Sequence, residues 1–394
     1  MGLLRRKSQS DLGLWARIGA TGFGGPAGQI SIMHREVVQQ RGWLDEDQFA
    51  HALSFCMLLP GPEAHQLATY IGWRRHGLRG ALTSSAFFVI PGAVLMLALS
   101  WIYVLYGNVT WVSGLLSGLQ AAVIAIVAQA LIRMGKRQLS SSVMFVIAGV
   151  SFIGLVFFAV PFPIIIIVAG VGGWLTTLIR RHDTETAATT TAYTRPANSR
   201  KTLVAAFIGI SVWIVSVAAV CMFAGGTVFP DIGLLFSKTA IITFGGAYAV
   251  LGYIAQQAVM SYGWLSAGQM TVGLGLAETT PGPLILVLEF VGFVAAYEHP
   301  GMLPPLLAGT LGALLTLWVL FLPSTCFVLL GAPFLERLRS NVPLRGALKA
   351  IGASVVGVVA SLGLWLSINT LCANVGVWTW GPLHVMQPHL DSIR

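Results

Sequence analysis

The chain has 394 residues, of which 56% are hydrophobic and only 9% are charged, and its net charge is +9. So small a charged share excludes a water-soluble fold and indicates a lipid bilayer as the main solvent. Basic residues beside membrane helices report topology, so we read the positive charge in that sense and predict no nucleic-acid partner.

Apolar stretches long enough to cross about 30 Å of hydrocarbon as helices recur along nearly the whole chain. We predict eleven such segments: 12–40, 49–72, 81–106, 112–134, 142–160, 161–180, 203–226, 234–260, 268–296, 304–331 and 347–372. A polar, Thr- and Ala-rich stretch between two of them predicts a linker at 181–202. The linker divides the chain into an N-terminal transmembrane unit with extra helices at 12–180 and a second unit at 203–372, followed by a short tail at 373–394.

The charges predict which side of the membrane each loop occupies. If every segment crosses once, most of the 23 lysines and arginines gather on the side of the N-terminus and the linker, which the positive-inside rule assigns to the cytoplasm. The same count places acidic residues on the opposite face, namely Asp45, Glu46, Asp47, Asp231 and Glu298. A pair of re-entrant segments would preserve this parity, so the sidedness is better determined than the number of spans.

A repeat runs through the chain at two constant offsets. Three pairs share the offset that separates Phe23 from Phe244, namely Phe23-Gly24-Gly25 with Phe244-Gly245-Gly246, Gly42-Trp43-Leu44 with Gly263-Trp264-Leu265, and Pro60-Gly61-Pro62 with Pro281-Gly282-Pro283. Two later pairs share a longer offset, namely Gly80-Ala81-Leu82 with Gly312-Ala313-Leu314, and Pro91 with Pro323, so residues are inserted between the blocks of the second copy. Five ordered matches indicate a duplicated unit. An odd number of segments separates the copies, which predicts an all-α polytopic membrane protein of about 10–11 transmembrane or broken helices in two inverted-topology repeats, a plan typical of secondary transporters.

The repeated motifs predict breaks in membrane helices. Pro-Gly-Pro at mid-depth removes two backbone donors, so helices should break there and restart at Pro62 and Pro283 with their positive N-terminal ends facing a central cavity. Phe-Gly-Gly, with Pro26 after the first copy, suggests a second break in each repeat, where glycines allow backbone to approach an anion. The alternative is that Gly and Pro only permit kinks and close packing; four symmetry-related breaks favour a binding site.

Ionisable residues inside apolar segments are few, and each is a functional candidate because burying its charge is costly. Glu63 and Glu278 lie beside the two Pro-Gly-Pro motifs, and Glu289 follows the second one. A carboxylate at a helix start competes with an anionic substrate for the same positive potential, which suggests proton coupling; the alternative is a structural helix cap.

Basic residues offer candidate anion ligands. Arg17 and Lys238 stand at the same distance before the two Phe-Gly-Gly motifs, with snorkelling to the interface as the alternative. Arg74 and Arg75 end the second segment, where they could collect anions at the cytoplasmic mouth, although anchoring the helix end explains them more simply.

Several classes of protein lack support in the sequence. The four cysteines fall in apolar segments without paired ligand spacing, and neither a GxxxxGK[ST] loop nor a G-x-S-x-G elbow is present. We therefore predict no metal, no cofactor and no enzyme activity. An ion channel remains an alternative to a carrier because channels also contain broken helices.

The blocks FGGPAGQISIMHREVVQQRGWL, LLPGPEAHQLATYIGWRRHG and TTPGPLILVLEFVGF resemble the paired signatures of the two-domain chromate ion transporter family, over roughly residues 15–135 and 236–366. The resemblance implies a multi-pass carrier of the bacterial inner membrane, with a cytoplasmic N-terminus, that exports chromate and confers chromate resistance. Sulfate or another oxyanion, taken up rather than exported, is the alternative cargo; protons are a candidate coupling ion and a homodimer a candidate assembly.

The same resemblance marks the expected functional positions. With the symmetry-related residues, the predicted substrate site comprises Phe23, Gly24, Gly25, Pro26, Pro60, Gly61, Pro62, Gln66, Tyr70, Lys238, Phe244, Gly245, Gly246, Pro281, Gly282 and Pro283. Glu63, Glu278 and Glu289 are the predicted coupling residues. Glu289 stands where the family signature leads us to expect glutamine, which puts simple anion coordination at that point in question.

Overall fold

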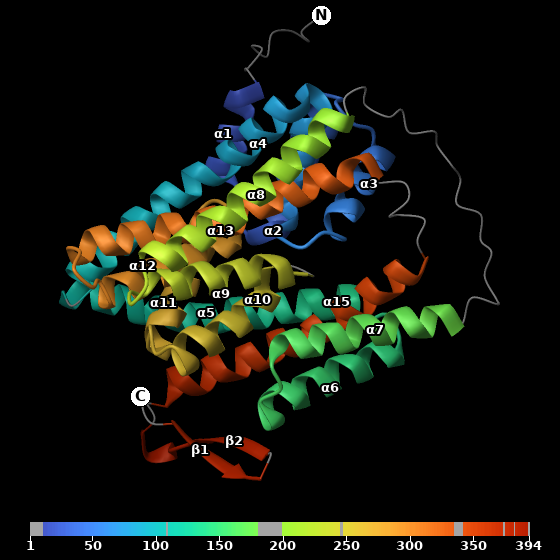
Figure 1. The fold of residues 1–394 in the computed structure, drawn as a ribbon. Helices are drawn as coiled ribbons and strands as arrows, with labels where there is room; N and C mark the ends of the chain where they lie inside the picture. Colours follow the sequence, from blue (N-terminus) through green and yellow to red (C-terminus); the bar gives the residue numbers. More distant parts are fainter. Residues whose placement is uncertain are drawn as a thin grey trace, which may run out of the picture.

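The computed structural model describes residues 11–107, 109–179, 199–244, 247–334, 342–372, 375–381 and 383–392, and they are almost entirely helical (Figure 1). The α-helices are α1 (Asp11–Thr21), α2 (Gly25–His34), α3 (Glu46–Cys56), α4 (Glu63–Tyr106), α5 (Thr110–Gln138), α6 (Ser142–Phe158), α7 (Phe162–Ile179), α8 (Ser199–Phe223), α9 (Phe229–Ile242), α10 (Ala247–Ala255), α11 (Ala267–Thr279), α12 (Val287–Glu298), α13 (Pro305–Gly331) and α15 (Val342–Leu371). Shorter turns are the π-helical η1 (Arg35–Gln40) and η2 (Gln256–Ser261) and the 3₁₀-helical η3 (Leu284–Leu286), η4 (Ala332–Phe334) and η5 (Leu390–Ser392).

Within the described residues, six helices are long and apolar enough to cross a membrane: α4, α5, α7, α8, α13 and α15. The apolar helix α6 is slightly shorter, at 17 residues. The outer helices also expose large hydrophobic side chains, with Val146, Ile167 and Phe207 each more than 60% accessible. A helix that is apolar on its outer face as well as its inner one is solvated by lipid. The protein is therefore a polytopic helical membrane protein.

Helix α4 is not one straight rod, because the chain reverses direction at His76 and Gly77. Both residues leave the helical conformation, and Gly77 has φ 61° and ψ −144°. His65 Nε2 lies 2.7 Å from Ser85 Oγ, although residues that far apart along a straight helix would be about 30 Å apart. We call the two antiparallel arms α4a (residues 63–75) and α4b (residues 78–106).

Helices α12 and α13 form the equivalent hairpin in the second copy. Gly292 packs against the carbonyl of Gly312 and the side chain of Thr316, as Gly72 packs against the carbonyl of Gly80 and the side chain of Ser84. The second hairpin has a longer turn, between Glu298 and Pro305. The inserted residues therefore lie at the tip of this hairpin, where added length disturbs no helix packing.

The copies also match in local structure. The π-turns η1 and η2 begin at equivalent positions of the repeat, and after each one the backbone N–H of Trp43 or Trp264 donates to a carbonyl at 2.8 Å. Next, Asp45 caps α3 by accepting from the Gln48 N–H, and Ser266 caps α11 in a reciprocal capping box. The duplicated sequence thus folds in the same way twice.

The predicted segments at 12–40, 49–72, 234–260 and 268–296 are broken at the Phe-Gly-Gly and Pro-Gly-Pro motifs, as the sequence predicts. Each of these stretches is interrupted by residues that belong to no helix, and the helices on either side are short. The rings of Phe55 and Tyr70 lie 5.6 Å apart on opposite sides of one interruption, so α3 and α4a fold back on each other. At this interruption the chain reverses its direction instead of only bending.

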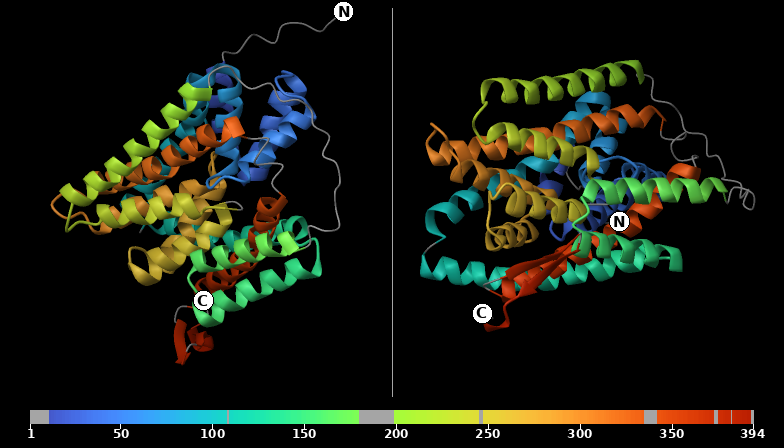
Figure 2. Two further views of the ribbon diagram at one scale, coloured as in Figure 1. Left: turned by 45° about the vertical axis from the view of Figure 1, so that its right-hand side comes forward. Right: turned by 60° about the horizontal axis from the view of Figure 1, so that its bottom comes forward.

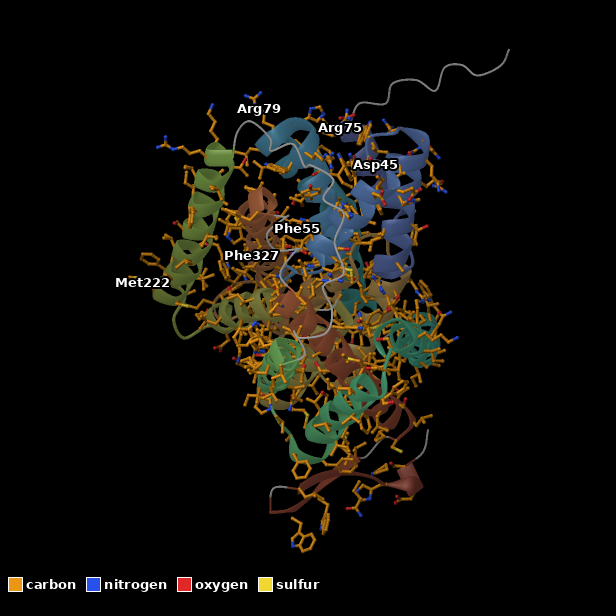
Figure 3. All side chains as sticks on the ribbon, turned by 90° about the vertical axis from the view of Figure 1, so that its right-hand side faces the viewer. Asp45, Phe55, Arg75, Arg79, Met222 and Phe327 are labelled. Atoms are coloured by element: carbon orange, nitrogen blue, oxygen red, sulfur yellow. The ribbon has the colours of Figure 1, made fainter. Side chains whose placement is uncertain are left out.

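The predicted sidedness of Asp45, Glu46 and Asp47 is wrong for the same reason. The Arg75 guanidinium stacks on the Trp43 ring at 3.8 Å, so the loop that carries Asp45 lies at the basic tip of the α4 hairpin. Figure 3 shows Asp45 near Arg75 and Arg79. Counting crossings placed this loop on the far face because the count took two re-entrant stretches for two spans.

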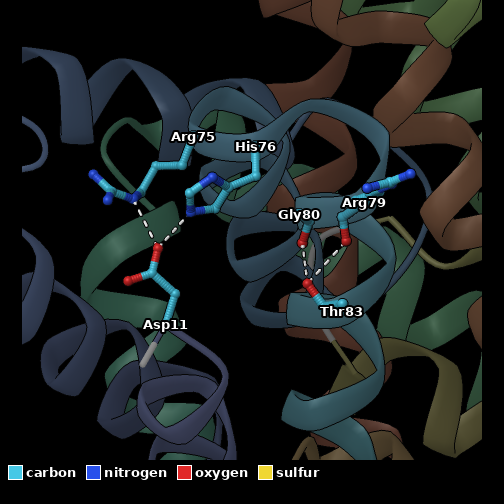
Figure 4. Close-up of polar contacts among 6 residues, drawn as sticks. All are labelled: Asp11, Arg75, His76, Arg79, Gly80 and Thr83. Carbon is cyan, nitrogen blue, oxygen red and sulfur yellow. Dashed lines mark hydrogen bonds and ion pairs between the residues drawn. The ribbon is translucent and has the colours of Figure 1, made fainter. Parts of the chain in front are cut away.

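Asp11, at the start of α1, fastens the same tip. Its carboxylate accepts from Arg75 Nε at 3.2 Å and pairs with His76 Nε2 at 2.5 Å (Figure 4). Burial of Asp11 opposes ionisation, but the hydrogen bonds from His76 and Arg75 outweigh burial and lower the pKa of the carboxyl below its ordinary 3.8. The contribution of this group to stability is therefore present above its ordinary pKa and is lost as the pH falls through the lowered value.

Among the helices that the structure describes, α6, α7 and α8 have no counterpart in the repeat. Helices α6 and α7 pack with α5 against α15, whereas α8 packs against α13 and α9 (Figures 1 and 2). The short tail predicted at 373–394 contains an antiparallel β-hairpin of β1 (Val375–Trp380) and β2 (Leu383–Pro388). Alternation of β-branched and aromatic residues and a left-handed Gly381 at the turn account for this hairpin.

The hairpin fold makes a prediction about exposure at the two ends of the molecule. In a cysteine-free background, single cysteines at Asp45 and Arg79 should react with a membrane-impermeant maleimide from the same side of the membrane. A cysteine at Glu298 should react only from the other side. Labelling of positions 45 and 79 from opposite sides would restore the single-crossing topology and refute the hairpins.

Candidate functional site

The first helix break lies between α1 and α2, at Gly22-Phe23-Gly24-Gly25. Gly24 and Gly25 have φ values of 85° and 67°, a left-handed conformation that favours glycine, and Pro26 stands in the first turn of α2. Phe23 is half exposed. In the second copy, Phe244 is described, whereas Gly245 and Gly246 lie outside the described residues.

The two Pro-Gly-Pro motifs form buried turns before α4a and η3. Gly61 has φ 130° and Gly282 has φ 105°. Pro62 and Pro283 have extended backbones and directly precede the first helical residues, Glu63 and Leu284. The predicted restarts of the helices at these prolines are thus confirmed.

The breaks of one copy are hydrogen-bonded to the breaks of the other. The backbone N–H of Gly61 donates to the carbonyl of Thr243 at 2.8 Å, and the N–H of Gly282 donates to the carbonyl of Gly22 at 3.2 Å. Both acceptors directly precede a Phe-Gly-Gly motif. The amide of Gln29 reinforces the second contact, because its Nε2 donates to the carbonyls of both Gly22 and Gly282. Each Pro-Gly-Pro turn is therefore fastened to the other copy's Phe-Gly-Gly break.

Each Pro-Gly-Pro turn also lies against the proline-containing helix of the other copy. A Cβ atom on Gly61 would come within 2.6 Å of Ser324 Oγ, and one on Gly282 would come within 3.2 Å of Gly92 Cα. Ser324 follows Pro323 in α13, and Gly92 follows Pro91 in α4b. Segments distant in sequence thus meet on each side with no room for a side chain on the turn glycine.

A buried polar network connects the first Pro-Gly-Pro turn to α4b and α13. His65 Nδ1 lies 3.3 Å from Ser324 Oγ, His65 Nε2 lies 2.7 Å from Ser85 Oγ, and Ser85 Oγ lies 3.0 Å from Thr325 Oγ1. All four side chains are at most 9% exposed.

The hydrogen atoms of this network can be placed by counting donors. Thr325 Oγ1 donates to the carbonyl of Phe321, so it must accept from Ser85, and Ser85 must accept from His65 Nε2–H. His65 Nδ1 then accepts from the Ser324 hydroxyl. A neutral histidine therefore satisfies every bond, and the network orients Ser324 beside Gly61.

This network exists on one side only. At the equivalent positions of the other copy, His65 and Ser85 are matched by Leu286 and Leu317. Ser85, Ser324 and Thr325 could not be identified from the sequence, because single hydroxyl residues in membrane helices carry no signal of their own.

The remaining predicted polar residues near the turns have different partners. Gln66 Nε2 donates to the carbonyl of Pro60 at 2.7 Å, and its Oε1 is buried without a hydrogen-bond partner among the described residues. Tyr70 is buried between Phe55 and Trp73, one helical turn beyond Gln66. Gln66 thus belongs to the turn, whereas Tyr70 packs behind it.

The three predicted coupling carboxylates occupy distinct surroundings. Glu63 is half-buried at the first residue of α4a. Glu278 is also half-buried, and it accepts from the Tyr248 hydroxyl at 2.5 Å. Glu289 is 1% exposed within α12, and its Oε2 has no hydrogen-bond partner among the described residues.

The predicted basic ligands have other engagements. Arg17 forms an ion pair with the buried Glu36 at 2.5 Å. Lys238 is exposed and lies over the Tyr253 ring at 5.6 Å. Arg75 is held by Asp11 and Trp43 at the hairpin tip, next to Arg74. The contacts of Arg17, Lys238 and Arg75 within the described part of the chain do not include the glycines of the breaks, so a role of these basic residues as ligands stays a prediction.

Comparison with known proteins adds the following. The chain matches the family described as "Chromate transporter" over residues 12–174 and 230–386. It is 31% identical over 355 residues to the chromate transport protein of Pseudomonas aeruginosa, and the matched region covers 88% of this chain and 77% of that protein. It is 29% identical over 347 residues to the chromate transport protein of Cupriavidus metallidurans, with the same coverage of both chains. No solved structure matches this chain.

The polar network makes a prediction about stability. Ser85→Ala would leave the His65 Nε2–H buried without an acceptor, which costs about 1–3 kcal/mol, so the midpoint of thermal unfolding in detergent should fall by several degrees. Ser100→Ala is the control, because Ser100 is equally buried in α4b but bonds only to the Met96 carbonyl of its own helix at 2.8 Å. Equal midpoints for the two variants would show that the network contributes nothing to stability.

Proposed function

The chain belongs to the chromate transporter family, and on that premise we propose that it is a secondary transporter that exports chromate across the bacterial inner membrane. The oxyanion binds between the Phe-Gly-Gly and Pro-Gly-Pro breaks, and the two copies alternate in opening this site to either face. Sulfate, a tetrahedral dianion of similar size, is the second candidate cargo.

The observation that carries this proposal is the reciprocal pair of backbone hydrogen bonds. Gly61 is bonded to the carbonyl before the second Phe-Gly-Gly motif, and Gly282 to the carbonyl before the first. Any movement of one copy relative to the other must therefore alter both pairs of breaks together. Coupled breaks at a repeat interface are what alternating access requires.

Local backbone structure supports an anionic cargo. Helices α2 and α4a and the turn η3 all begin at the breaks, and the N-terminal end of a helix carries partial positive charge and free N–H groups. Glycine at these positions lets an anion approach the backbone closely. A tetrahedral oxyanion offers four acceptor oxygens and no donors, which suits such a site.

The arrangement of spans supports opposite orientation of the copies. Helices α6, α7 and α8 lie between the first copy, α1 to α5, and the second, α9 to α15. Three intervening crossings turn the second copy over relative to the first. With the N-terminus in the cytoplasm, as the basic residues favour, the α4 hairpin tip and the end of α5 face the cytoplasm.

The turn glycines provide the first test. In Gly61→Ala, the added methyl group meets Ser324 Oγ and Gln66 Nε2 in a backbone conformation that alanine rarely adopts, so chromate flux should fall at least tenfold. Gly42→Ala is the control, because Gly42 is also left-handed, with φ 60°, but a Cβ there meets nothing within 4 Å. Uptake of radiolabelled chromate into inside-out vesicles, normalised to the amount of folded protein, measures both. Equal flux in the two variants would place the site elsewhere.

Glu63 provides a test of proton coupling. Glutamine keeps its size and hydrogen-bonding capacity but cannot release a proton, so Glu63→Gln should still exchange chromate for chromate while losing stimulation by an imposed pH gradient. The measurement is flux in proteoliposomes with and without the gradient, at equal protein content. Unchanged stimulation would leave Glu63 a helix-capping role, and the variants Glu278→Gln and Glu289→Gln would then be compared in the same assay.

A further inference from the structure

The last turns of α5 carry two arginines, Arg133 and Arg137, near the segments that precede the Pro-Gly-Pro turns. Arg137 Nη2 contacts Met57 Sδ at 3.3 Å, on the segment that leads into Pro60. Arg133 lies one helical turn earlier on the same face of α5, and α5 packs against α11, the helix that carries Glu278. One face of α5, with its arginines one turn apart, therefore lies close to the segments that lead into the two Pro-Gly-Pro turns.

Both guanidinium groups are available to a ligand. Each arginine is exposed, and within the described residues neither one closes an ion pair with a carboxylate. Glu63 and Glu278 are themselves half-buried. A guanidinium presents a planar fork of donors that matches two oxygens of a tetrahedral oxyanion, and two such groups balance a dianion.

The opposite mouth lacks this charge. The longer offset of the repeat, the one that relates Pro91 to Pro323, matches Arg133 and Arg137 with Trp365 and Asn369. Asn369 lines a cavity of about 610 Å³, formed by the ends of α4, α5, α11, α12 and α15. The described residues that line it include Glu298 and no lysine or arginine. The duplicated framework thus has a basic mouth at one end and a weakly acidic one at the other.

We propose that Arg133 and Arg137 form the capture site for a divalent oxyanion at the α5 end, and that the cation-free cavity at the opposite end is where the anion leaves. In the empty transporter, the two arginines balance Glu63 and Glu278. An entering dianion neutralises the positive charge of the two arginines. The carboxylates then lose their counter-charges, which favours their protonation. This inference rests on the proposed function and gives its site a side-specific affinity.

A difference between the mouths does not by itself drive transport. At equilibrium, the concentrations on the two sides are set by the driving gradient, whereas the protein sets only the concentration at which each side saturates. The expected signature is therefore an asymmetry of KM, low at the α5 end and high at the other end.

The test uses Arg133→Gln and Arg137→Gln, with Lys136→Gln as the matched control. Lys136 lies in the same turn of α5 and its substitution removes the same charge, but it forms no ion pair or hydrogen bond within the described residues. Chromate uptake into inside-out vesicles and into right-side-out vesicles gives KM at each face. Each arginine variant should raise KM about tenfold or more at the cytoplasmic face and less than threefold at the other, while Lys136→Gln stays close to wild type at both.

Two further results decide the matter. Arg137→Lys keeps the charge but loses the planar fork of donors, so its KM at the cytoplasmic face should lie between those of wild type and Arg137→Gln. Binding of chromate to the purified protein in detergent should weaken in the same order. Arginine variants that match Lys136→Gln would overturn this inference while leaving the proposed transport intact. A wild-type protein that moves no chromate would overturn both.

Discussion

A helix that breaks in the middle of a bilayer exposes backbone groups that no water can satisfy, and this constraint organises the whole molecule. Each unpaired N–H or C=O in hydrocarbon costs several kcal/mol, so a broken membrane helix is stable only if another part of the protein supplies partners. Here those partners come from the other copy of the repeat, through the bonds of Gly61 to Thr243 and of Gly282 to Gly22. The breaks are therefore possible only because they meet in pairs.

The need to bring four breaks together explains the unusual density of small residues around them. Gly92 and Ser324 stand where the turn glycines approach α4b and α13, and Gly72, Gly80, Gly292 and Gly312 let the hairpin arms pack with backbone against backbone. Close approach of this kind replaces the hydrophobic effect, which gives helices little reason to associate inside lipid. Side chains reinforce the two junctions, by which we mean the contact of each Pro-Gly-Pro turn with the other copy. Gln29 bonds to the turn at Gly282, and the His65 network connects the turn at Gly61 to α13. The two junctions are thus built on the same plan but differ in chemistry.

The sequence predicted the elements that depend on short-range chemistry. Proline and glycine determine backbone geometry locally, so the breaks at Pro60-Gly61-Pro62 and Pro281-Gly282-Pro283 could be placed before the structure was known, as could the duplication. The reversal at His76–Gly77 could not, because hydropathy reports the length of an apolar segment and not its direction. That omission placed Asp45 on the wrong face. Ser324 and Gln29 also escaped notice, since their importance comes from partners in the other copy of the repeat. Arg133 and Arg137 could not be distinguished by sequence from residues that only set topology, because basic residues at a helix end have that meaning in most membrane proteins.

The central claim is that one central site opens alternately to the two faces, and counterflow tests it most directly. Proteoliposomes are loaded with unlabelled chromate and diluted into a trace of labelled chromate, with the membrane potential clamped at zero. A carrier returns loaded with whichever ion it meets, so the account predicts a transient accumulation of label inside the vesicles above its equilibrium level. Simple equilibration of label without this overshoot is the behaviour of a channel and would contradict the account.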